Sequence, residues 1–197
     1  VLSGDSGLEI AESLSMIMKM DFTKLETRKF PDGESYVRVP EEAIESIRSE
    51  EVILVSNTFP DSGIMKTLFL LSAINDIRKG NLTNVKQEGE IQLGDVGPGV
   101  ILAIPYFGYA RQDKRFSWGE SAKVIGEILS NHCEGMVILD LHEPGVLNEL
   151  KVPTRFVSSM PEIANFLSID VKPDFILSPD KGAISRATEV ANIIGSK

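Results

Sequence analysis

One segment of the chain, residues 105–116, combines side chains that bind phosphate with side chains that stack on flat rings. It reads PYFGYARQDKRF and follows the apolar run at 100–104 directly. Arginine offers planar, forked donors that match phosphate oxygens, and it also lies flat on aromatic faces. The segment therefore predicts a site for a ligand that carries both a ring and phosphate. The plainer alternative is a basic surface turn whose aromatic side chains plug the core.

Two further loops carry groups of the same kind where apolar runs end. Asp140, His142 and Glu143 follow GMVIL, and the sequence SPDKG with Asp180 follows FIL. In a doubly wound sheet, function lies in the loops beyond the carboxyl ends of the strands, so we expect all three loops to meet at one edge. Their arginine, glutamine, histidine and carboxylates suit a polyphosphate with a divalent cation, because Mg²⁺ takes oxygen ligands and keeps its waters.

Each candidate residue also has an ordinary structural explanation. An aspartate at a strand end, such as Asp140, often caps a loop, and His142 fits a hydrogen-bonded surface histidine equally well. Asp180 lies in Pro-Asp-Lys-Gly and Asp32 precedes a glycine, and both are typical of plain turns. These alternatives remain open at the level of the sequence.

The elements that position these loops alternate between strands and helices. Buried strands are predicted at 51–56, 101–104, 135–140 and 175–178, with a shorter alternating strand at 35–39. Apolar spacing predicts helices at 8–18, capped by Asp5 or Ser6, and at 62–77, 121–129, 160–167 and 183–194. Continuously apolar strands separated by helices indicate an α/β fold with a doubly wound, mostly parallel sheet.

One stretch, residues 79–99, interrupts this alternation. It contains five glycines and a proline between a predicted helix and the next strand. A connection of this length is unusual between packed elements. We predict a polar surface hairpin, inserted without a catalytic role because long surface insertions cost little free energy.

Composition limits the class of protein. The chain has 197 residues, 42% of them hydrophobic, and a net charge of −9, which argues against a general nucleic-acid binder but not against a nucleotide substrate. The single cysteine excludes a disulfide framework and suits a reducing cytoplasm. No apolar run is long enough for a membrane span, and the start lacks the basic region of a signal peptide. We therefore expect a cytoplasmic protein.

Four motifs together resemble the ribose-phosphate pyrophosphokinase family, also called phosphoribosyl pyrophosphate synthetases, and its archaeal members in particular. They are FPDGE at 30–34, PYFGYARQDKRF at 105–116, DLHEPG at 140–145 and SPDKGAISRA at 178–187. The resemblance implies a phosphoribosyltransferase-like fold. It also implies Mg²⁺-dependent transfer of the pyrophosphoryl group of ATP to ribose 5-phosphate, giving phosphoribosyl pyrophosphate and AMP for nucleotide biosynthesis.

The resemblance also implies roles for individual residues. Arg111, Gln112 and Asp113 match the segment that holds ATP, and His142 matches the histidine beside Mg²⁺ and the phosphates, so that Arg111 and His142 are the expected catalytic residues. Asp180 matches the aspartate on the metal and ribose 5-phosphate side. Phe30, Asp32 and Glu34 match a loop that reaches the adenine pocket of a neighbouring subunit, which implies at least a homodimer with a shared ATP site.

In the resembled family, two phosphoribosyltransferase-like domains face one another. We expect residues 1–150 to form the first domain and residues 151–197 to be the junction and opening βα unit of an incomplete second. The family's Lys-x-Arg loop and its Thr-Gly-Gly phosphate loop would follow Lys197. The chain is therefore expected to be truncated at its C-terminus and inactive alone. A non-catalytic, synthetase-associated regulatory homologue is the main alternative, and a salvage phosphoribosyltransferase is a weaker one.

Overall fold

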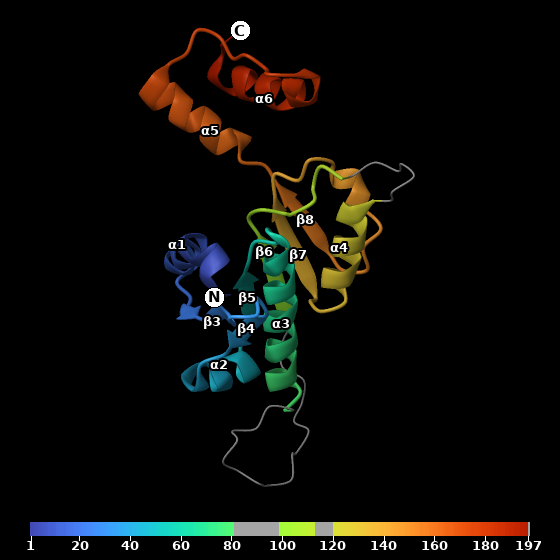
Figure 1. Cartoon of the computed structure of the whole chain (residues 1–197). Helices are drawn as coiled ribbons and strands as arrows, with labels where there is room; N and C mark the ends of the chain where they lie inside the picture. The colour runs from blue at the N-terminus through green and yellow to red at the C-terminus, as the bar shows by residue number, and fades with distance from the viewer. Residues whose placement is uncertain (81–98, 113–119, 197) are drawn as a thin grey trace. The chain divides into compact units, whose positions relative to one another are not determined.

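The computed structural model describes residues 1–80, 99–112 and 120–196 (Figure 1). The chain divides into two compact units, Val1–Phe156 and Val157–Lys197. The predicted hairpin at 79–99 lies almost entirely outside the described residues. Among the residues described, no helix is both long enough and apolar enough to cross a bilayer.

A six-stranded sheet forms the centre of the first unit. Its order is β2 (Thr23–Lys24), β1 (Leu2–Ser3), β5 (Val52–Val55), β6 (Val100–Ile104), β7 (Gly135–Leu139) and β8 (Thr154–Val157). β1 pairs in parallel with β2 and β5, β5 with β6, and β6 with β7. Leu54, Leu102 and Ile138 are completely buried in the middle of these strands. The predicted α/β fold with a mostly parallel sheet is confirmed.

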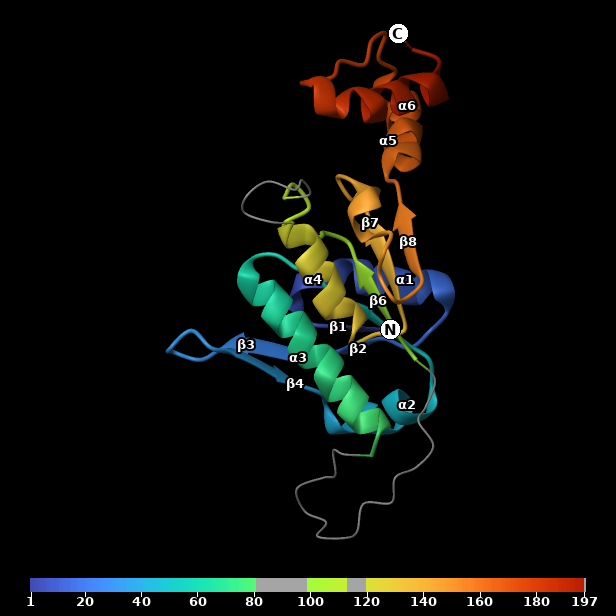
Figure 2. The same ribbon diagram turned by 90° about the vertical axis from the view of Figure 1, so that its right-hand side faces the viewer.

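Helices cover both faces of this sheet. In the order of the chain, α1 (Leu8–Met18) connects β1 to β2. α3 (Asp61–Arg78) connects β5 to β6, and α4 (Ser121–Ser130) connects β6 to β7. The step from β1 to β2 crosses the sheet in the opposite direction to the steps from β5 to β7. Because parallel crossovers are right-handed, α1 lies on one face and α3 and α4 lie on the other, as Figures 1 and 2 show.

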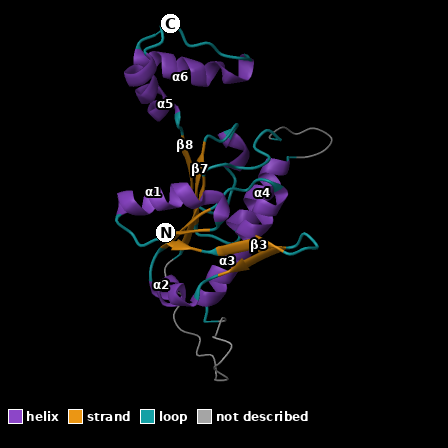
Figure 3. Cartoon of the chain, turned by 60° about the vertical axis from the view of Figure 1, so that its left-hand side comes forward, coloured by secondary structure: helices purple, strands orange, loops and turns teal. Residues whose placement is uncertain are grey.

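A separate antiparallel hairpin extends beside α3 (Figure 3). It consists of β3 (Glu26–Lys29) and β4 (Ser35–Arg38), and Lys29 pairs with Ser35 next to the turn. The short helix α2 (Ile44–Ser49) follows and packs on α3. β4 confirms the strand predicted at 35–39. The polar strand β3 gives no apolar pattern and was not predicted.

The second unit is helical. α5 (Met160–Phe166) continues as a π-helical turn (Leu167–Val171), and α6 (Ile184–Ile194) packs against α5. The strand predicted at 175–178 is wrong, because these residues adopt no strand. A strand needs a neighbour for its backbone hydrogen bonds, and the described part of this unit contains no strand after Val157, the last residue of β8. Leu177 is accordingly 88% exposed.

The predicted cap of α1 is also wrong. Gly7 stands at the N-cap, and Asp5 belongs to a preceding 3₁₀ turn (Asp5–Gly7). The carboxylate of Asp5 is engaged elsewhere, because it accepts a hydrogen bond from Thr27 and pairs with Lys24. Tertiary contacts therefore override the local capping preference.

Candidate functional site

Four loops leave the sheet at its carboxyl edge. They are residues 4–7 after β1, 56–60 after β5, 105–112 after β6 and 140–143 after β7. β6 and β7 are paired in register, with Ile104 opposite Ile138, so the loops that follow them start side by side. Two of the three predicted site loops therefore share one edge of the sheet. The third, at 178–182, lies in the second unit, and its approach to the other two stays a prediction.

The loop after β6 places Arg111 and Gln112 in solvent. Its backbone turns at Tyr109, whose φ of 64° lies in the left-handed region, and the amide of Gln112 donates to the Tyr109 carbonyl at 2.8 Å. The Gln112 carbonyl accepts from the Ala122 amide in the first turn of α4 at 3.3 Å. Both predicted phosphate-binding side chains are thus carried on a folded loop. Asp113, the third residue of that prediction, lies outside the described residues.

The loop after β7 carries Asp140 and His142. Asp140 has a φ of 48° and is partly buried, and the His142 side chain is exposed. Glu143 accepts a hydrogen bond from the Gly145 amide at 3.2 Å and so caps a short 3₁₀ helix (Pro144–Leu147). The loop therefore presents a histidine one strand away from Arg111.

The tip of the β3–β4 hairpin carries the second group of predicted residues. Phe30 is 40% exposed, and the turn closes through a 2.9 Å bond from the Phe30 amide to the Glu34 carbonyl. The Asp32 carboxylate accepts from the Glu34 amide at 3.0 Å, so the plain turn role of Asp32 is confirmed. Phe30 and Tyr36 meet edge to face, with ring centroids 5.5 Å apart. The tip therefore offers a fixed aromatic ring and carboxylates to solvent.

Asp180 caps a helix in the second unit. Its Oδ1 accepts a 2.9 Å hydrogen bond from the Ala183 amide, and Ser178 donates to its carbonyl at 2.6 Å. These bonds start the 3₁₀ turn (Lys181–Ala183) that leads into α6. The side chain remains exposed. The turn explanation of Asp180 is therefore confirmed, while its role toward a metal and ribose 5-phosphate stays a prediction.

Sequence reasoning missed the loop after β5. Its Asn57 side chain donates to the Ser6 carbonyl and accepts from the Tyr106 amide at 2.9 Å. Thr58 Oγ1 accepts from the Gly108 amide at 2.7 Å. This loop therefore joins the loops after β1 and β6. The signal was present, because three polar residues at 56–58 and a proline at 60 come directly after the apolar run EVILV.

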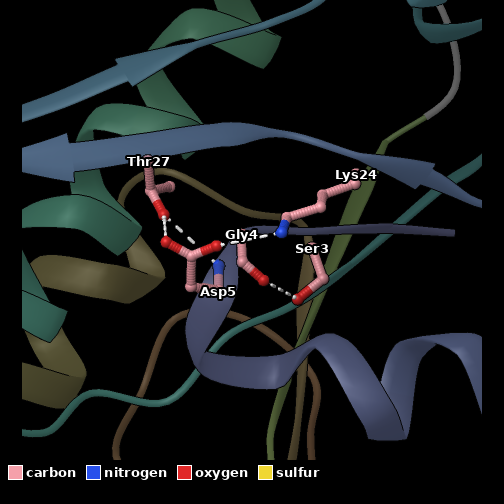
Figure 4. A network of polar contacts seen from close by, with 5 residues as sticks. All are labelled: Ser3, Gly4, Asp5, Lys24 and Thr27. Atoms are coloured by element: carbon pink, nitrogen blue, oxygen red, sulfur yellow. Dashed lines mark hydrogen bonds and ion pairs between the residues drawn. The ribbon is translucent and has the colours of Figure 1, made fainter.

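The loop after β1 is tied to the hairpin through Asp5 (Figure 4). The Thr27 hydroxyl donates to Asp5 Oδ2 at 2.7 Å, and Lys24 Nζ lies 3.3 Å from Oδ1. The Thr27 hydrogen bond, followed by the Lys24 contact, holds the pKa of Asp5 below its ordinary value. The carboxylate of Asp5 thus anchors β3 at the edge where the predicted site loops begin.

No three histidine, cysteine or acidic side chains gather into a metal cluster within the described residues. Mg²⁺ bound to a polyphosphate takes most of its ligands from phosphate and water, so one or two protein groups suffice. The exposed carboxylate of Asp180 is an oxygen ligand of the type that Mg²⁺ prefers.

Comparison with known proteins gives a consistent result along the chain. Residues 1–85 match a family model described as the N-terminal domain of ribose phosphate pyrophosphokinase. The chain is 34% identical over 199 residues to the ribose-phosphate pyrophosphokinase of Methanothermobacter thermautotrophicus, an alignment that covers 99% of this chain and 62% of that protein. It is 35% identical over 201 residues to that of Saccharolobus solfataricus, covering 100% of this chain and 62% of the relative. The chain thus spans about three fifths of the length of these curated relatives.

The fold is similar to a solved structure. The crystal structure of phosphoribosylpyrophosphate synthetase from Mycobacterium smegmatis superposes with a TM-score of 0.75 at 20% sequence identity, over 99% of this chain and 61% of that one. This likeness supports the fold that the strands and helices display.

Proposed function

We propose that the chain belongs to the ribose-phosphate pyrophosphokinase family, which its relatives and the match over residues 1–85 support, and that the protein makes phosphoribosyl pyrophosphate and AMP from ATP and ribose 5-phosphate. The 1-hydroxyl oxygen of the sugar forms a bond to the β-phosphorus of ATP, the bond from that phosphorus to the α,β-bridging oxygen breaks, and the hydroxyl proton is released. One observation carries the proposal: the loops with Arg111 and His142 follow two adjacent strands that are paired in parallel.

Arg111 and Gln112 are the side chains that we propose to hold the phosphates of ATP. Both are exposed on the loop after β6, where they can meet a ligand. The guanidinium neutralises phosphate charge with forked donors, and the amide adds a neutral donor. This reaction needs charge neutralisation and positioning rather than a protein nucleophile. Asp113 completes the proposed ATP segment from a position outside the described residues.

His142 is proposed as the second catalytic residue. Its exposed imidazole can donate to a phosphate oxygen as negative charge develops during transfer. We propose His142 and Asp180, each taken by itself, as residues that would hold Mg²⁺, which when bound would supply positive charge to neutralise the phosphates. The exposed carboxylate of Asp180 fits this role, and its Oδ1 is held in place by the Ala183 amide.

We further propose a homodimer or a larger assembly in which the hairpin serves the ATP site of a neighbouring subunit. The support is the exposed tip, which presents the ring of Phe30 and the carboxylates of Asp32 and Glu34 away from the hydrophobic core. The ring supplies a stacking surface for a purine, and the carboxylates accept hydrogen bonds from its exocyclic amine.

The activity is tested by measuring AMP and phosphoribosyl pyrophosphate in the full-length protein that contains this chain. Arg111→Ala is expected to abolish turnover without lowering the melting temperature. The matched control is Arg38→Ala, which removes an exposed arginine from β4 and should leave turnover unchanged. A wild-type protein that forms neither product would overturn the proposal and favour a non-catalytic relative.

The shared site is tested by mixing two inactive variants. Phe30→Ala removes the ring that the hairpin would contribute to the ATP site of the neighbouring subunit. Arg111→Ala removes the phosphate-binding side chain from the subunit's own loop after β6. In a mixed assembly, some sites combine an intact hairpin with an intact loop, so co-refolded variants should regain activity that neither has alone. Inactivity of the verified mixed assembly would contradict the shared site.

A further inference from the structure

The loop after β5 holds the loop after β6 through a series of hydrogen bonds. Asn57 accepts from the Tyr106 amide at 2.9 Å, and the Thr58 amide donates to the Tyr106 carbonyl at 3.1 Å. Thr58 Oγ1 accepts from the Gly108 amide at 2.7 Å. The last bond is between side chains: the Tyr109 hydroxyl donates to Asp61 Oδ1 at 2.6 Å. The backbone is therefore fixed as far as Gly108, and the phenol fixes the next residue.

We infer that the Asp61–Tyr109 hydrogen bond is a latch that positions Arg111 and Gln112 for their ligand. Asp61 and Tyr109 act as positioning residues, because they work through the backbone of the loop. The kinetic part of this inference rests on the proposed function, whereas its structural part does not.

The position of Asp61 makes it a firm anchor. It is the first residue of α3, an 18-residue helix whose Leu70, Leu71 and Ile74 lie in the core. A carboxylate in the first turn also interacts favourably with the helix dipole. The acceptor of the latch is thus attached to one of the best-packed elements of the unit.

Tyr109 needs such an anchor. Its φ of 64° is unfavourable for a residue with a side chain. This conformation directs the Tyr109 carbonyl to the Gln112 amide, closing the turn that carries Arg111. The latch opposes relaxation of Tyr109 to a commoner conformation. The same contact raises the pKa of the Tyr109 phenol above its ordinary value, because the carboxylate accepts a hydrogen bond from the neutral hydroxyl and repels the phenolate.

Loss of the latch should lower the rate of reaction with ATP rather than the stability of the fold. Misplacing a catalytic group by about 1 Å can cost on the order of 100-fold in rate. The hydroxyl bond contributes little to the core, because Tyr109 is only partly buried. We therefore expect Tyr109→Phe to keep its melting temperature while kcat/KM for ATP falls by about tenfold or more.

The experiment compares four variants of the full-length protein. Tyr109→Phe and Asp61→Ala each remove the latch, whereas Asp61→Asn keeps an oxygen acceptor and should restore most of the lost function. Tyr106→Phe is the matched control, because it removes a hydroxyl from the same loop that bonds to no residue the structure describes. The readouts are hydrogen exchange of the amides at 106–112 and steady-state kinetics with ATP.

Faster exchange of the Gln112 amide in Tyr109→Phe and Asp61→Ala, together with weaker kinetics, would support the latch. Exchange equal to that of Tyr106→Phe would overturn it. Faster exchange with unchanged ATP kinetics would overturn the positioning role. An Asp61→Asn variant as defective as Asp61→Ala would assign the effect to charge and reject the hydrogen bond. If the wild type forms no product, the proposed function fails and exchange alone decides the latch.

Discussion

The Thr27 hydroxyl donates a 2.7 Å hydrogen bond to Oδ2 of Asp5, although 22 residues separate them in the sequence. This bond is the largest cause of the lowered pKa of Asp5. A depressed carboxyl pKa stabilises the folded state above the unfolded value of about 3.8, and this contribution is lost as pH falls through the folded pKa. The network in Figure 4 is therefore weakened by acid.

We predict that Thr27→Val raises the pKa of Asp5 and lowers the free energy of unfolding more at pH 7 than at pH 3. Loss of the 3.3 Å bond from the Asp5 amide to Thr27 Oγ1 is independent of pH, so a residual difference persists in acid. Urea unfolding at both pH values and carboxyl titration by NMR measure the effect. Thr23→Val on β2 is the control. Equal losses at both pH values would contradict the prediction.

The close approach of Gly108 and Thr58 gives a second prediction. A Cβ at residue 108 would lie 2.1 Å from the Thr58 carbonyl oxygen, and both groups belong to loops held by hydrogen bonds. Because a backbone atom cannot swing away as a flexible side chain can, Gly108→Ala should destabilise the fold by about 1–3 kcal/mol. Urea unfolding measures this change in free energy.

Gly145→Ala is the matched control for Gly108→Ala. Its added Cβ meets only the flexible end of Glu143, at 3.2 Å. The control should therefore lose much less stability. If Gly108→Ala loses as little stability as Gly145→Ala, the loops after β5 and β6 can move apart easily and the prediction is wrong.

Cys133 is predicted to be unreactive in the folded protein. Its side chain is 7% exposed, and burial raises the pKa of its thiol to about 11. About one thiol in a thousand is then ionised at pH 8, and the thiolate is the reactive form. A disulfide reagent should label the native protein far more slowly than the protein unfolded in guanidinium chloride. Equally rapid labelling in both states would place the thiol at the surface.

The sequence was most informative where burial imposes a simple pattern. The helix at 8–18 was predicted with the bounds that α1 has, and the apolar run at 100–104 is β6. β3 and α2 were missed because ETRK is polar and IESIRS is only six residues long. Tertiary contacts hold β3, since Thr27 is bound to Asp5, and such contacts leave no periodic signal.

Some parts of the candidate site could be predicted from the sequence, and others could not. The positions of Arg111 and His142 after neighbouring strands followed from the rule that loops at the carboxyl ends of strands converge. Applied to β5, the same rule would have identified residues 57–61. The direction in which Asp61 meets Tyr109 could not be predicted, because it depends on the left-handed backbone at Tyr109.

A final prediction concerns the arginine that stacks at the hairpin tip. Arg28 Cζ lies 4.4 Å from the centroid of the Tyr36 ring and 5.3 Å from that of Phe30. An exposed cation–π contact contributes about 0.5–1 kcal/mol. The ion pair of Arg28 with Glu26, at 3.5 Å, contributes less because both side chains are exposed.

Arg28→Ala and Tyr36→Leu are therefore expected to show a coupling energy of about 0.5 kcal/mol in a double-mutant cycle. Arg28→Lys should keep part of it, since the charge remains but the planar stacking is lost. In a Phe30→Trp variant that also carries Trp118→Phe, the fluorescence anisotropy should fall on adding Arg28→Ala if the guanidinium restrains the ring. Zero coupling and unchanged anisotropy would mean that Arg28 does not orient Phe30, which leaves the bond between the Phe30 amide and the Glu34 carbonyl and the edge-to-face contact with Tyr36.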